Sequence, residues 1–310
     1  MSDGVPDTGG SETVRVFEEH RDLLVGVAYR ILGRVTDAED VVQEAWLRWT
    51  SVIASEVDNP RAFLVRVTSR LAIDRLRRLK ARRETYVGPW LPEPVLTDRD
   101  VAEDVALAES VSMAMLVVLE TLSPLERAVF VLREAFGMPY AEIAGILGRS
   151  EAAVRQLARR ARDHVREGGP RFETDQETRR RVTERFLEAA LGGNMEALMD
   201  VLAPGVTLVA DGGGRARAPL RPIYGADKVA RFLLAVTTEE GMARFLESIG
   251  SEPSGRVDAR AAQVNGGPGV VITAGGEPIS VLVLDVAGGM VRNVHLVANP
   301  EKLVGVRVEP

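Results

Sequence analysis

The fold is decided by two neighbouring stretches, TDAEDVVQEAWLRW at residues 36–49 and PRAFLVRVTSRLAIDRLRRLKARR at residues 60–83. The first stretch is acidic, whereas the second is basic along its length and has Asp74 as its single acidic residue. Its cations are Arg61, Arg66, Arg70, Arg75, Arg77, Arg78, Lys80, Arg82 and Arg83. Such a density of positive charge suits a polyanion far better than a protein core. One module therefore presents two surfaces of opposite sign, and the acidic surface needs a partner of its own.

The acidic stretch predicts an amphipathic helix. Thr36 supplies N-cap chemistry, and Glu39 follows it at the spacing of a capping box. The expected inward-facing residues are Val41, Val42, Ala45 and Trp49. The expected outer face consists of Asp37, Asp40, Gln43, Glu44 and Arg48. This face is either an ordinary solvated surface, with carboxylates well placed for the helix dipole, or the binding surface for a basic partner.

The basic stretch predicts a second helix that begins at Pro60, where the missing N–H does no harm. Its expected buried residues are Phe63, Leu64, Val67 and Leu71. Asp74 can pair with Arg77 or Arg78 on the next turn. The remaining arginines are left for phosphate groups. Two tryptophans near the end of the preceding helix, Trp46 and Trp49, either belong to the core or offer flat faces to unstacked bases.

Composition excludes several classes of protein. The chain is 45% hydrophobic and 27% charged, which indicates a globular protein of two or three domains. It contains no cysteine, so disulfide scaffolds and thiolate zinc sites are excluded. No apolar run approaches the roughly 20 residues of a membrane helix, and the N-terminus lacks the features of a secretion signal. We expect a cytoplasmic protein without a membrane segment, in which residues 1–12 are disordered.

Residues 84–104 indicate an acidic, proline-rich linker. GPWLPEPV at residues 88–95 contains three prolines, which favour an extended path. Trp90 and Leu91 are too apolar for a linker whose side chains make no contacts. They either dock on another part of the molecule or anchor the linker locally.

Residues 105–168 predict a second helical module that ends in a helix-turn-helix. YAEIAGILGRSEAAVRQLARRAR at residues 140–162 gives a short helix, a turn at Gly148 and a basic helix capped by Ser150. The second helix of such a motif lies in the major groove and reads bases near its N-terminus. The alternative is a charged solvent face on an ordinary helical bundle.

The chemistry of the last helix separates base contacts from phosphate contacts. Arg155 and Gln156 are the candidates for base edges, because arginine pairs with guanine and glutamine with adenine. The phosphate candidates are Arg149, Arg159 and Arg160.

DAEDVVQEAW, NPRAFLVRVTSRLAIDRLRR and the helix-turn-helix stretch together resemble the two domains of bacterial sigma-70 family factors of the extracytoplasmic-function type. The resemblance covers roughly residues 17–166, with residues 13–83 as region 2 and residues 105–168 as region 4. It implies a non-catalytic protein that binds core RNA polymerase and promoter DNA. One departure is Arg70, which stands where many family members have asparagine.

The resemblance also implies a role for each surface. The residues implied to grip the clamp helices of the polymerase large subunit are Asp37, Asp40, Gln43 and Glu44. The loop at residues 50–59 is implied to capture a flipped base. The residues implied to bind the −10 element are Trp46, Trp49, Arg61, Arg66, Arg70, Arg75, Arg77 and Arg78. Those implied to bind the −35 element are Arg149, Ser150, Arg155, Gln156, Arg159 and Arg160.

After a linker at residues 169–176, residues 177–310 predict an α+β domain, since helices are followed by alternating strand-like runs. The order resembles the SnoaL-like, NTF2-like cone fold, which a subgroup of sigma factors carries as an extension; SigJ-type factors belong to it. The marks of that subgroup are WLPEP, DGGGR and NPEKL, which contain Trp90, Leu91, Pro92, Asp211, Gly212, Gly213, Gly214, Asn299 and Pro300. The resemblance favours regulation in cis, with the extension docked on the rest of the chain.

Related cones include enzymes with paired acid and base groups, and Asp211, Tyr224 and His295 are the candidates here. Asp211 is more simply a turn residue, and His295 a half-buried strand residue. We therefore expect no enzyme, no cofactor and no metal. Two rival hypotheses remain: a dimeric transcription regulator that works without polymerase, and a cone-fold enzyme or ligand sensor with a DNA-binding appendage.

Overall fold

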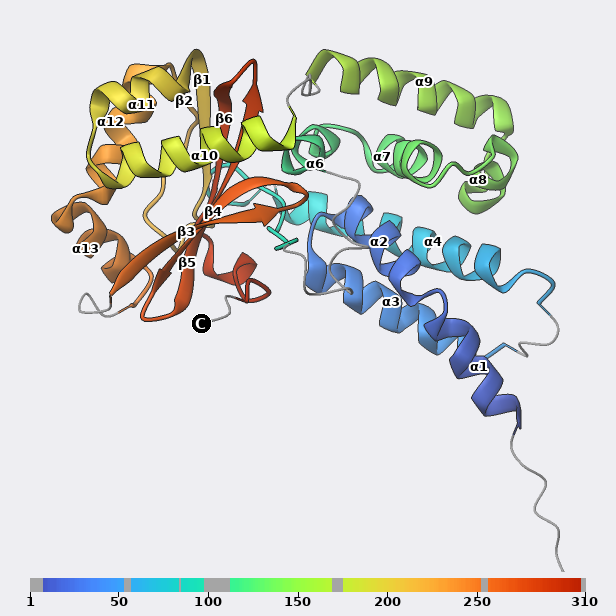
Figure 1. The fold of residues 1–310 in the computed structure, drawn as a ribbon. Helices are drawn as coiled ribbons and strands as arrows, with labels where there is room; N and C mark the ends of the chain where they lie inside the picture. The colour runs from blue at the N-terminus through green and yellow to red at the C-terminus, as the bar shows by residue number, and fades with distance from the viewer. Residues whose placement is uncertain are drawn as a thin grey trace, which may run out of the picture. The chain divides into compact units, whose positions relative to one another are not determined.

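The computed structural model describes residues 8–52, 57–83, 85–97, 112–168, 175–251 and 256–307. The chain divides into two compact units (Figure 1). The first unit, residues 1–82 and 118–168, contains both helical modules. The second unit, residues 83–117 and 169–310, contains the linker after the first module together with the C-terminal domain.

The first unit is helical. Its elements are α1 (Thr8–Glu18), α2 (Arg21–Leu32), α3 (Val35–Thr50), α4 (Pro60–Arg83), the end of α6 (Met113–Glu120), α7 (Pro124–Phe130), the π-helix η2 (Val131–Ala135), α8 (Tyr140–Leu147) and α9 (Glu151–Gly168). Helix α4 begins at Pro60 as predicted, and Gly33 ends α2 in the left-handed conformation. The all-helical prediction for this part of the chain is confirmed.

Two predictions near the N-terminus are wrong. A helix begins at Thr8, within the range expected to be disordered; residues 1–7 lie outside the described residues. Helix α3 starts at Val35, one residue before the expected cap, and its N-cap residue Arg34 makes no side-chain capping bond. The expected capping box of Thr36 and Glu39 is therefore absent, because both residues already lie inside the helix.

Helices α3 and α4 are joined by an ion pair. Nε and an Nη atom of Arg75 donate to the same carboxylate oxygen of Asp37, at 2.9 and 2.6 Å. The same Nη atom donates to Asp40 at 3.1 Å. Asp37 is buried, whereas Arg75 is partly exposed. The acidic and basic stretches are thus held together by one of their own arginines.

The second half of this unit follows its predicted signals. Ser123 and Glu126 form a complete capping box at the start of α7, with Pro124 in the first turn. The Ser123 hydroxyl lowers the pKa of Glu126, which keeps this carboxylate ionised. Gly148 ends α8 at φ 62°, and the Ser150 hydroxyl accepts from the Ala153 N–H at 3.3 Å.

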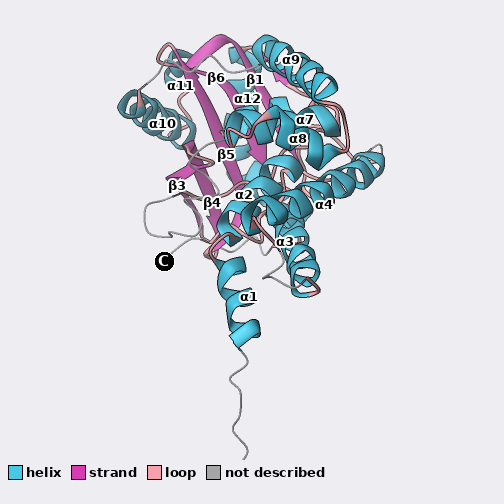
Figure 2. Cartoon of the chain, turned by 90° about the vertical axis from the view of Figure 1, so that its right-hand side faces the viewer, coloured by secondary structure: helices cyan, strands magenta, loops and turns pink. Residues whose placement is uncertain are grey.

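The second unit contains one mixed sheet in the order β2-β1-β6-β5-β4-β3, in which β1 and β6 are parallel and the other neighbours antiparallel (Figure 2). The strands are β1 (Leu202–Asp211), β2 (Ile223–Tyr224), β3 (Val257–Val264), β4 (Gly267–Ala274), β5 (Glu277–Ala287) and β6 (Met290–Val297). Its helices are α10 (Gln176–Leu191), α11 (Met195–Val201), α12 (Ala226–Thr237), α13 (Glu239–Ser248) and the short η3 (Pro300–Lys302). The predicted α+β class is confirmed.

The two faces of this sheet are covered differently. One face packs against α10, α11 and α12 through residues such as Phe186, Leu198 and Val229. The other face is covered by the linker, the start of α6 and the C-terminal tail, through Leu91, Met113, Leu303 and Val306. The linker therefore forms part of a hydrophobic core, and the residues Leu91 to Val95 are buried.

Two elements of this domain were not predicted from the sequence. Residues 223–224 form the edge strand β2, which pairs with Thr207 and Leu208 of β1. Helix α12 begins at Ala226, after Gly225 at φ 92°. Helix α13 was not predicted, because its sequence follows α12 with only Thr238 between them.

We predict that Asp37→Ala destabilises the first unit by about 2–3 kcal/mol, because it leaves Arg75 without its main partner and removes charge-assisted hydrogen bonds. Asp74→Ala is the matched control: it removes an aspartate from an exposed pair with Arg77 and should cost about 0.5 kcal/mol or less. Urea denaturation followed by tryptophan fluorescence measures both. Equal costs for the two variants would show that the Asp37–Arg75 pair is not a structural contact.

Candidate nucleic-acid interface and linker latch

The exposed stripe of α3 consists of Asp40, Gln43, Glu44 and Leu47. These positions share one side of the helix, because they are separated by three, four and seven residues. Glu44 pairs with Arg48 at 2.8 Å, and both side chains remain about half exposed. Leu47 is 63% exposed and was missed from the sequence, although its position one turn beyond Gln43 and Glu44 places it on the same side.

Asp37 does not belong to this stripe. Its expected place on the outer face is wrong, since its carboxylate is buried against Arg75. The hydrogen bond between Arg75 and Asp37 is the main cause that raises the pKa of Arg75, so this guanidinium group stays charged. Asp37 is therefore not available to a partner, whereas the Arg75 side chain remains partly exposed.

The two tryptophans of α3 differ in exposure. Trp49 is fully buried, and its Nε1 donates to the Thr13 carbonyl oxygen at 2.9 Å. The prediction that bases stack on Trp49 is therefore wrong, and the alternative prediction, that Trp49 is a core residue, is confirmed. Trp46 is partly exposed and packs edge-to-face on Phe17, with ring centroids 4.9 Å apart.

The arginines of α4 divide into exposed and engaged side chains. Arg61 and Arg66 are exposed, and Arg66 lies over the Phe63 ring at 5.5 Å. Arg77 pairs with Asp74 at 2.9 Å, which confirms the expected role of Asp74 in holding its own helix together. Arg78 remains exposed and reaches the Asp74 carbonyl oxygen at 3.3 Å.

Arg70 has a different partner from its neighbours. Its Nε donates to the Ile146 carbonyl oxygen at 2.6 Å, and an Nη atom donates to the Gly145 carbonyl oxygen at 3.0 Å. Both acceptors lie near the end of α8, the first helix of the helix-turn-helix. The structure thus uses Arg70 as a link between the two helical modules.

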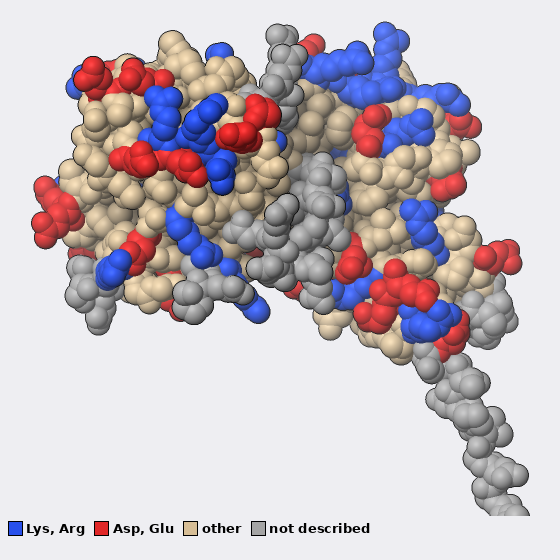
Figure 3. Space-filling view, viewed as in Figure 1, with Lys and Arg blue, Asp and Glu red and all other residues tan. Residues whose placement is uncertain are grey.

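The helix-turn-helix presents its predicted residues to solvent. Val154, Ala158, Ala161 and Val165 of α9 are buried, while Leu157 is half-buried. The predicted contact residues are all exposed: Arg149, Ser150, Arg155, Gln156, Arg159 and Arg160. Figure 3 shows basic side chains gathered along α9 and acidic ones over α3.

The side chain of Arg155 is held in place although it is exposed. It pairs with Glu151 one turn earlier and lies over the Tyr140 ring, 5.0 Å from its centroid. Stacking on an aromatic ring limits the freedom of a long side chain and orients its guanidinium group. Arg159, in contrast, has only a distant pair with Asp163 at 3.8 Å.

The three motifs of the second unit converge on Asp211, which is fully buried at the end of β1. One oxygen of its carboxylate accepts from the Tyr86 hydroxyl at 2.6 Å and from the Gly213 N–H at 3.1 Å. The other oxygen accepts from the Leu91 N–H at 2.8 Å and from Lys302 Nζ at 2.6 Å. We call this cluster of Tyr86, Trp90, Leu91, Asp211, Asn299 and Lys302 the linker latch.

Lys302 completes the linker latch from the C-terminal tail. Its ammonium group is buried, donates to the Leu91 carbonyl oxygen and lies 3.9 Å from the centroid of the Trp90 ring. A buried ammonium group is tolerated when it is paired with a carboxylate and an aromatic face. Trp90 therefore docks on another part of the molecule, one of the two possibilities predicted for it.

Asn299 ties the tail to both other motifs. Its N–H donates to the Asp211 carbonyl oxygen at 2.9 Å, and its side-chain amide donates to the Tyr86 hydroxyl at 2.9 Å. Gly213, at φ 61°, lies so close to the Asn299 amide that a Cβ atom there would clash. Pro92 and Pro300 flank the latch in sequence and donate none of the hydrogen bonds described above, and Gly212 and Gly214 complete the turn.

Sequence reasoning missed two members of the linker latch. Lys302 stands within NPEKL, but only Asn299 and Pro300 were nominated. No sequence signal identified Tyr86. Asp211 does serve the predicted turn through its bond with the Gly213 N–H, but the structure adds three partners that lie far away in the sequence.

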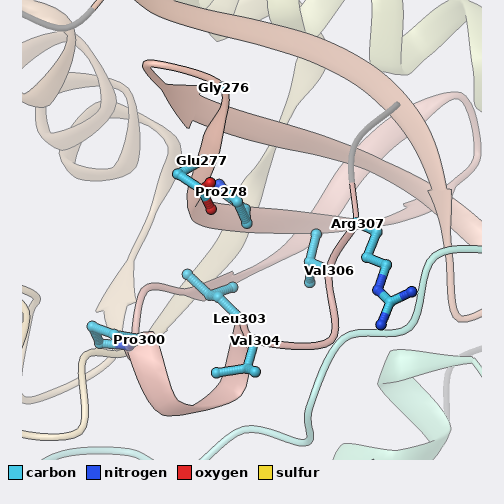
Figure 4. Close-up of a pocket in the computed structure, with 8 residues that line it drawn as sticks. All are labelled: Gly276, Glu277, Pro278, Pro300, Leu303, Val304, Val306 and Arg307. Carbon is cyan, nitrogen blue, oxygen red and sulfur yellow. The ribbon is translucent and has the colours of Figure 1, made fainter. Parts of the chain in front are cut away.

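A hollow of about 510 Å³ lies beside the tail. Figure 4 shows its lining residues, which come from the β4–β5 hairpin and from the tail; Pro278, Leu303 and Val304 are among them. Leu303 is buried, whereas Val304 is 77% exposed. The tail thus has one side in the core and one side open.

The three residues considered for catalysis do not meet. His295 Nε2 lies 3.0 Å from an Asp285 carboxylate oxygen, not at Asp211, and Asn293 donates to the same oxygen at 3.0 Å. Tyr224 is 64% exposed on the edge strand. Over the described ranges, no group of three metal-binding side chains occurs, and no helix has the length and apolar character of a membrane span.

Comparison with known proteins identifies both helical modules. The family model for sigma-70 region 2 matches residues 16–83, and that for sigma-70 region 4 matches residues 112–165. The extracytoplasmic-function sigma factor SigJ of Mycobacterium tuberculosis is 40% identical over 296 residues, which cover 94% of this chain and 93% of SigJ. The probable extracytoplasmic-function sigma factor SigI, from the same organism, is 33% identical over 296 residues, which cover 94% of this chain and 95% of SigI.

The fold agrees with this similarity. The crystal structure of M. tuberculosis SigJ superimposes with a TM-score of 0.75 at 37% identity and covers 96% of this chain and 100% of that one. The agreement extends from the helical modules through the α+β domain. The chain belongs to the extracytoplasmic-function sigma factors of the sigma-70 family, which act in transcription initiation and are not a class of enzymes.

Proposed function

We propose that the stripe Asp40, Gln43, Glu44 and Leu47 binds the core polymerase, and that α4 and α9 bind the −10 and −35 elements of the promoter. The observation that carries this proposal is the Asp37–Arg75 pair, which holds an exposed acidic stripe next to an arginine-rich helix. The polymerase performs the phosphodiester chemistry. Since the polymerase and the chromosome share the cytoplasm, we place the protein there.

The acidic stripe suits a basic helical partner. Asp40 and Glu44 supply charge, while Leu47 supplies an exposed apolar contact at the same stripe. Interfaces of this kind combine an apolar anchor with charges that steer encounter. Asp37 acts indirectly, because it positions α3 against α4 and does not itself reach a partner.

We assign some exposed residues of the DNA surfaces to base readout, which sets sequence preference, and others to phosphate contacts, which set affinity. On α9, Arg155 is oriented by Tyr140 and Gln156 is exposed next to it, which favours base readout. Arg159 and Arg160 are exposed further along α9, where they favour phosphate. On α4, the arginines Arg61, Arg66, Arg70, Arg77 and Arg78 are exposed.

We further propose that the C-terminal domain regulates the helical modules in cis through the linker latch. Tyr86 and Leu91 belong to the connection between regions 2 and 4. Through their hydrogen bonds to Asp211, the latch attaches this connection to the C-terminal domain. The two promoter elements are about 25 base pairs apart, which is roughly 85 Å at 3.4 Å per base pair. A connection that is tied down restricts how far the two modules can separate.

Catalysis is not part of this proposal. The cavity on the helical face of the sheet has a volume of about 80 Å³ and is lined mainly by apolar side chains such as Phe186, Phe232 and Leu282. Among the described residues that line it, Arg217 is the one ionisable side chain. It thus lacks the paired acid and base groups of a cone-fold enzyme.

Run-off transcription tests the proposal as a whole. Purified core polymerase, genomic DNA and the full chain should give promoter-specific starts that are absent without the chain. Starts that are unchanged by adding the chain would contradict it.

Charge reversal on α3 should abolish polymerase binding. Asp40→Lys combined with Glu44→Lys places like charge against a basic partner, and we expect at least a tenfold loss in a pull-down with core polymerase. Glu18→Lys is the control, because Glu18 is an exposed glutamate of the neighbouring helix α1 and does not belong to the stripe. Undiminished binding by the double variant, at unchanged circular dichroism, would refute the assignment.

Arg155→Ala should relax the preference for one base of the −35 element by about 1–3 kcal/mol. Arg159→Ala should instead weaken binding to all sequences and reduce the salt dependence. Selection from a promoter library, with binding repeated at two salt concentrations, separates these effects. The same change in preference for both variants would contradict the division.

Release of the linker latch should raise run-off transcription. Lys302→Met removes the buried ammonium group and leaves Asp211 without its cationic partner, so we expect the linker to be released. Limited proteolysis at residues 85–97 measures this release. Arg215→Met is the control, because Arg215 forms an exposed pair with Glu301 beside the latch. A freed linker with no rise in transcription would exclude this route of regulation.

A further inference from the structure

Helix α8 lies along the N-terminal half of α4 within the first unit. Arg70 spans the two helices with two hydrogen bonds, to the carbonyl oxygens of Ile146 and Gly145. A hollow of about 570 Å³ lies between the same segments, lined by Ala62, Phe63 and Arg66 from α4 and by Glu142 from α8, among other residues. The side of α4 that carries Ala62, Arg66 and Arg70 therefore faces α8.

The end of α8 is a suitable acceptor for an arginine. The last carbonyl groups of a helix have no partner within it and carry partial negative charge. The N–H groups of Gly148 and Arg149 both donate to the Ala144 carbonyl oxygen. The next two carbonyl groups, of Gly145 and Ile146, are those that accept from Arg70. This arginine thus supplies a helix end with the cation that it lacks.

This arrangement conflicts with simultaneous promoter reading. Helix α9 has 18 residues, which corresponds to about 27 Å at 1.5 Å per residue. A helix-turn-helix hydrogen-bonded to α4 cannot reach an element that lies roughly 85 Å away along the DNA. In addition, α8 faces the side of α4 on which Arg66 and Arg70 lie.

We propose that Arg70 holds the helical unit in a closed state in which α8 covers part of the −10 surface, and that this unit opens when polymerase and promoter bind. This inference rests on the proposed function of α4 and α9. It also accounts for the departure from the family pattern at position 70, because a shorter asparagine cannot span to the carbonyl groups of α8.

Further polar contacts join the helical modules, in addition to the contacts of the buried helix α2 with α7 and η2. Lys80 Nζ donates to the carbonyl oxygens of Glu120 and Leu122 at the end of α6. Arg127 is fully buried, and its Nε donates to the Arg30 carbonyl oxygen at 3.0 Å. Within the part of the chain that the structure describes, one Nη atom of Arg127 has no hydrogen-bond partner. Its other Nη atom pairs with the Glu120 carboxylate, so the charge of Arg127 has a partner.

Pulsed electron paramagnetic resonance on the full chain tests the closed state. The chain has no native cysteine, so Thr36→Cys on α3 and Ala152→Cys on α9, both exposed, accept spin labels cleanly. We expect one narrow distance distribution for the parent, and a population at longer distance, at least a fifth of the total, in Arg70→Asn. Adding Lys80→Gln should increase that population.

Arg78→Asn is the matched control, since Arg78 loses the same charge from α4 but bonds only within its own helix. It should leave the distance distribution unchanged. A distribution that is the same in the parent, Arg70→Asn and the double variant would overturn the proposal. Because this measurement needs neither polymerase nor DNA, its outcome is independent of run-off transcription: a chain that opens on Arg70→Asn but starts no transcripts would refute the proposed function alone.

Discussion

The ion pair between Asp37 and Arg75 is the contact on which the functional surfaces of the helical unit depend. A carboxylate that is removed from water is stable only with a partner nearby, and the partner here comes from the basic helix itself. The consequence is that α3 and α4 keep a fixed relation. Their remaining charges, acidic on one helix and basic on the other, are left for two different macromolecules.

Pairing of a cation with a group of the same protein recurs elsewhere in the molecule. Several cations have partners within the protein: Arg70 at the end of α8, Lys80 at the end of α6, Arg127 at the Arg30 carbonyl group, and Lys302 at Asp211. Positive charge in this chain therefore has two uses. Exposed guanidinium groups are available to nucleic acid, while the bonded ones join segments that are distant in sequence.

Much of the fold could be predicted from the sequence because its signals are local. The capping box at Ser123, the glycine turn at Gly148 and the apolar run in β5 each depend on a few adjacent residues. The exposed residues of α9 follow from the same periodicity. These features require no knowledge of which segments meet.

The predictions that failed depend on tertiary contacts. Helical periodicity places Asp37 on the polar side of α3, but Arg75, 38 positions later, draws it inward. Helical periodicity predicted that Trp49 faces inward, but not that its N–H bonds to Thr13, which belongs to a helix that begins where disorder was expected. Likewise, no spacing rule brings Tyr86, Asp211 and Lys302 together. Their meeting follows from the parallel pairing of β1 with β6, which places the end of β1 beside the start of the tail.

The separation of the linker latch along the chain has a consequence for biosynthesis. Leu91 and Lys302 are 211 positions apart, so at about 5–20 residues per second the ribosome delivers the lysine roughly 10–40 seconds after the linker. During that interval the nascent chain has both helical modules but an incomplete linker latch. If the latch regulates in cis as proposed, a message that ended early would release a factor without this restraint.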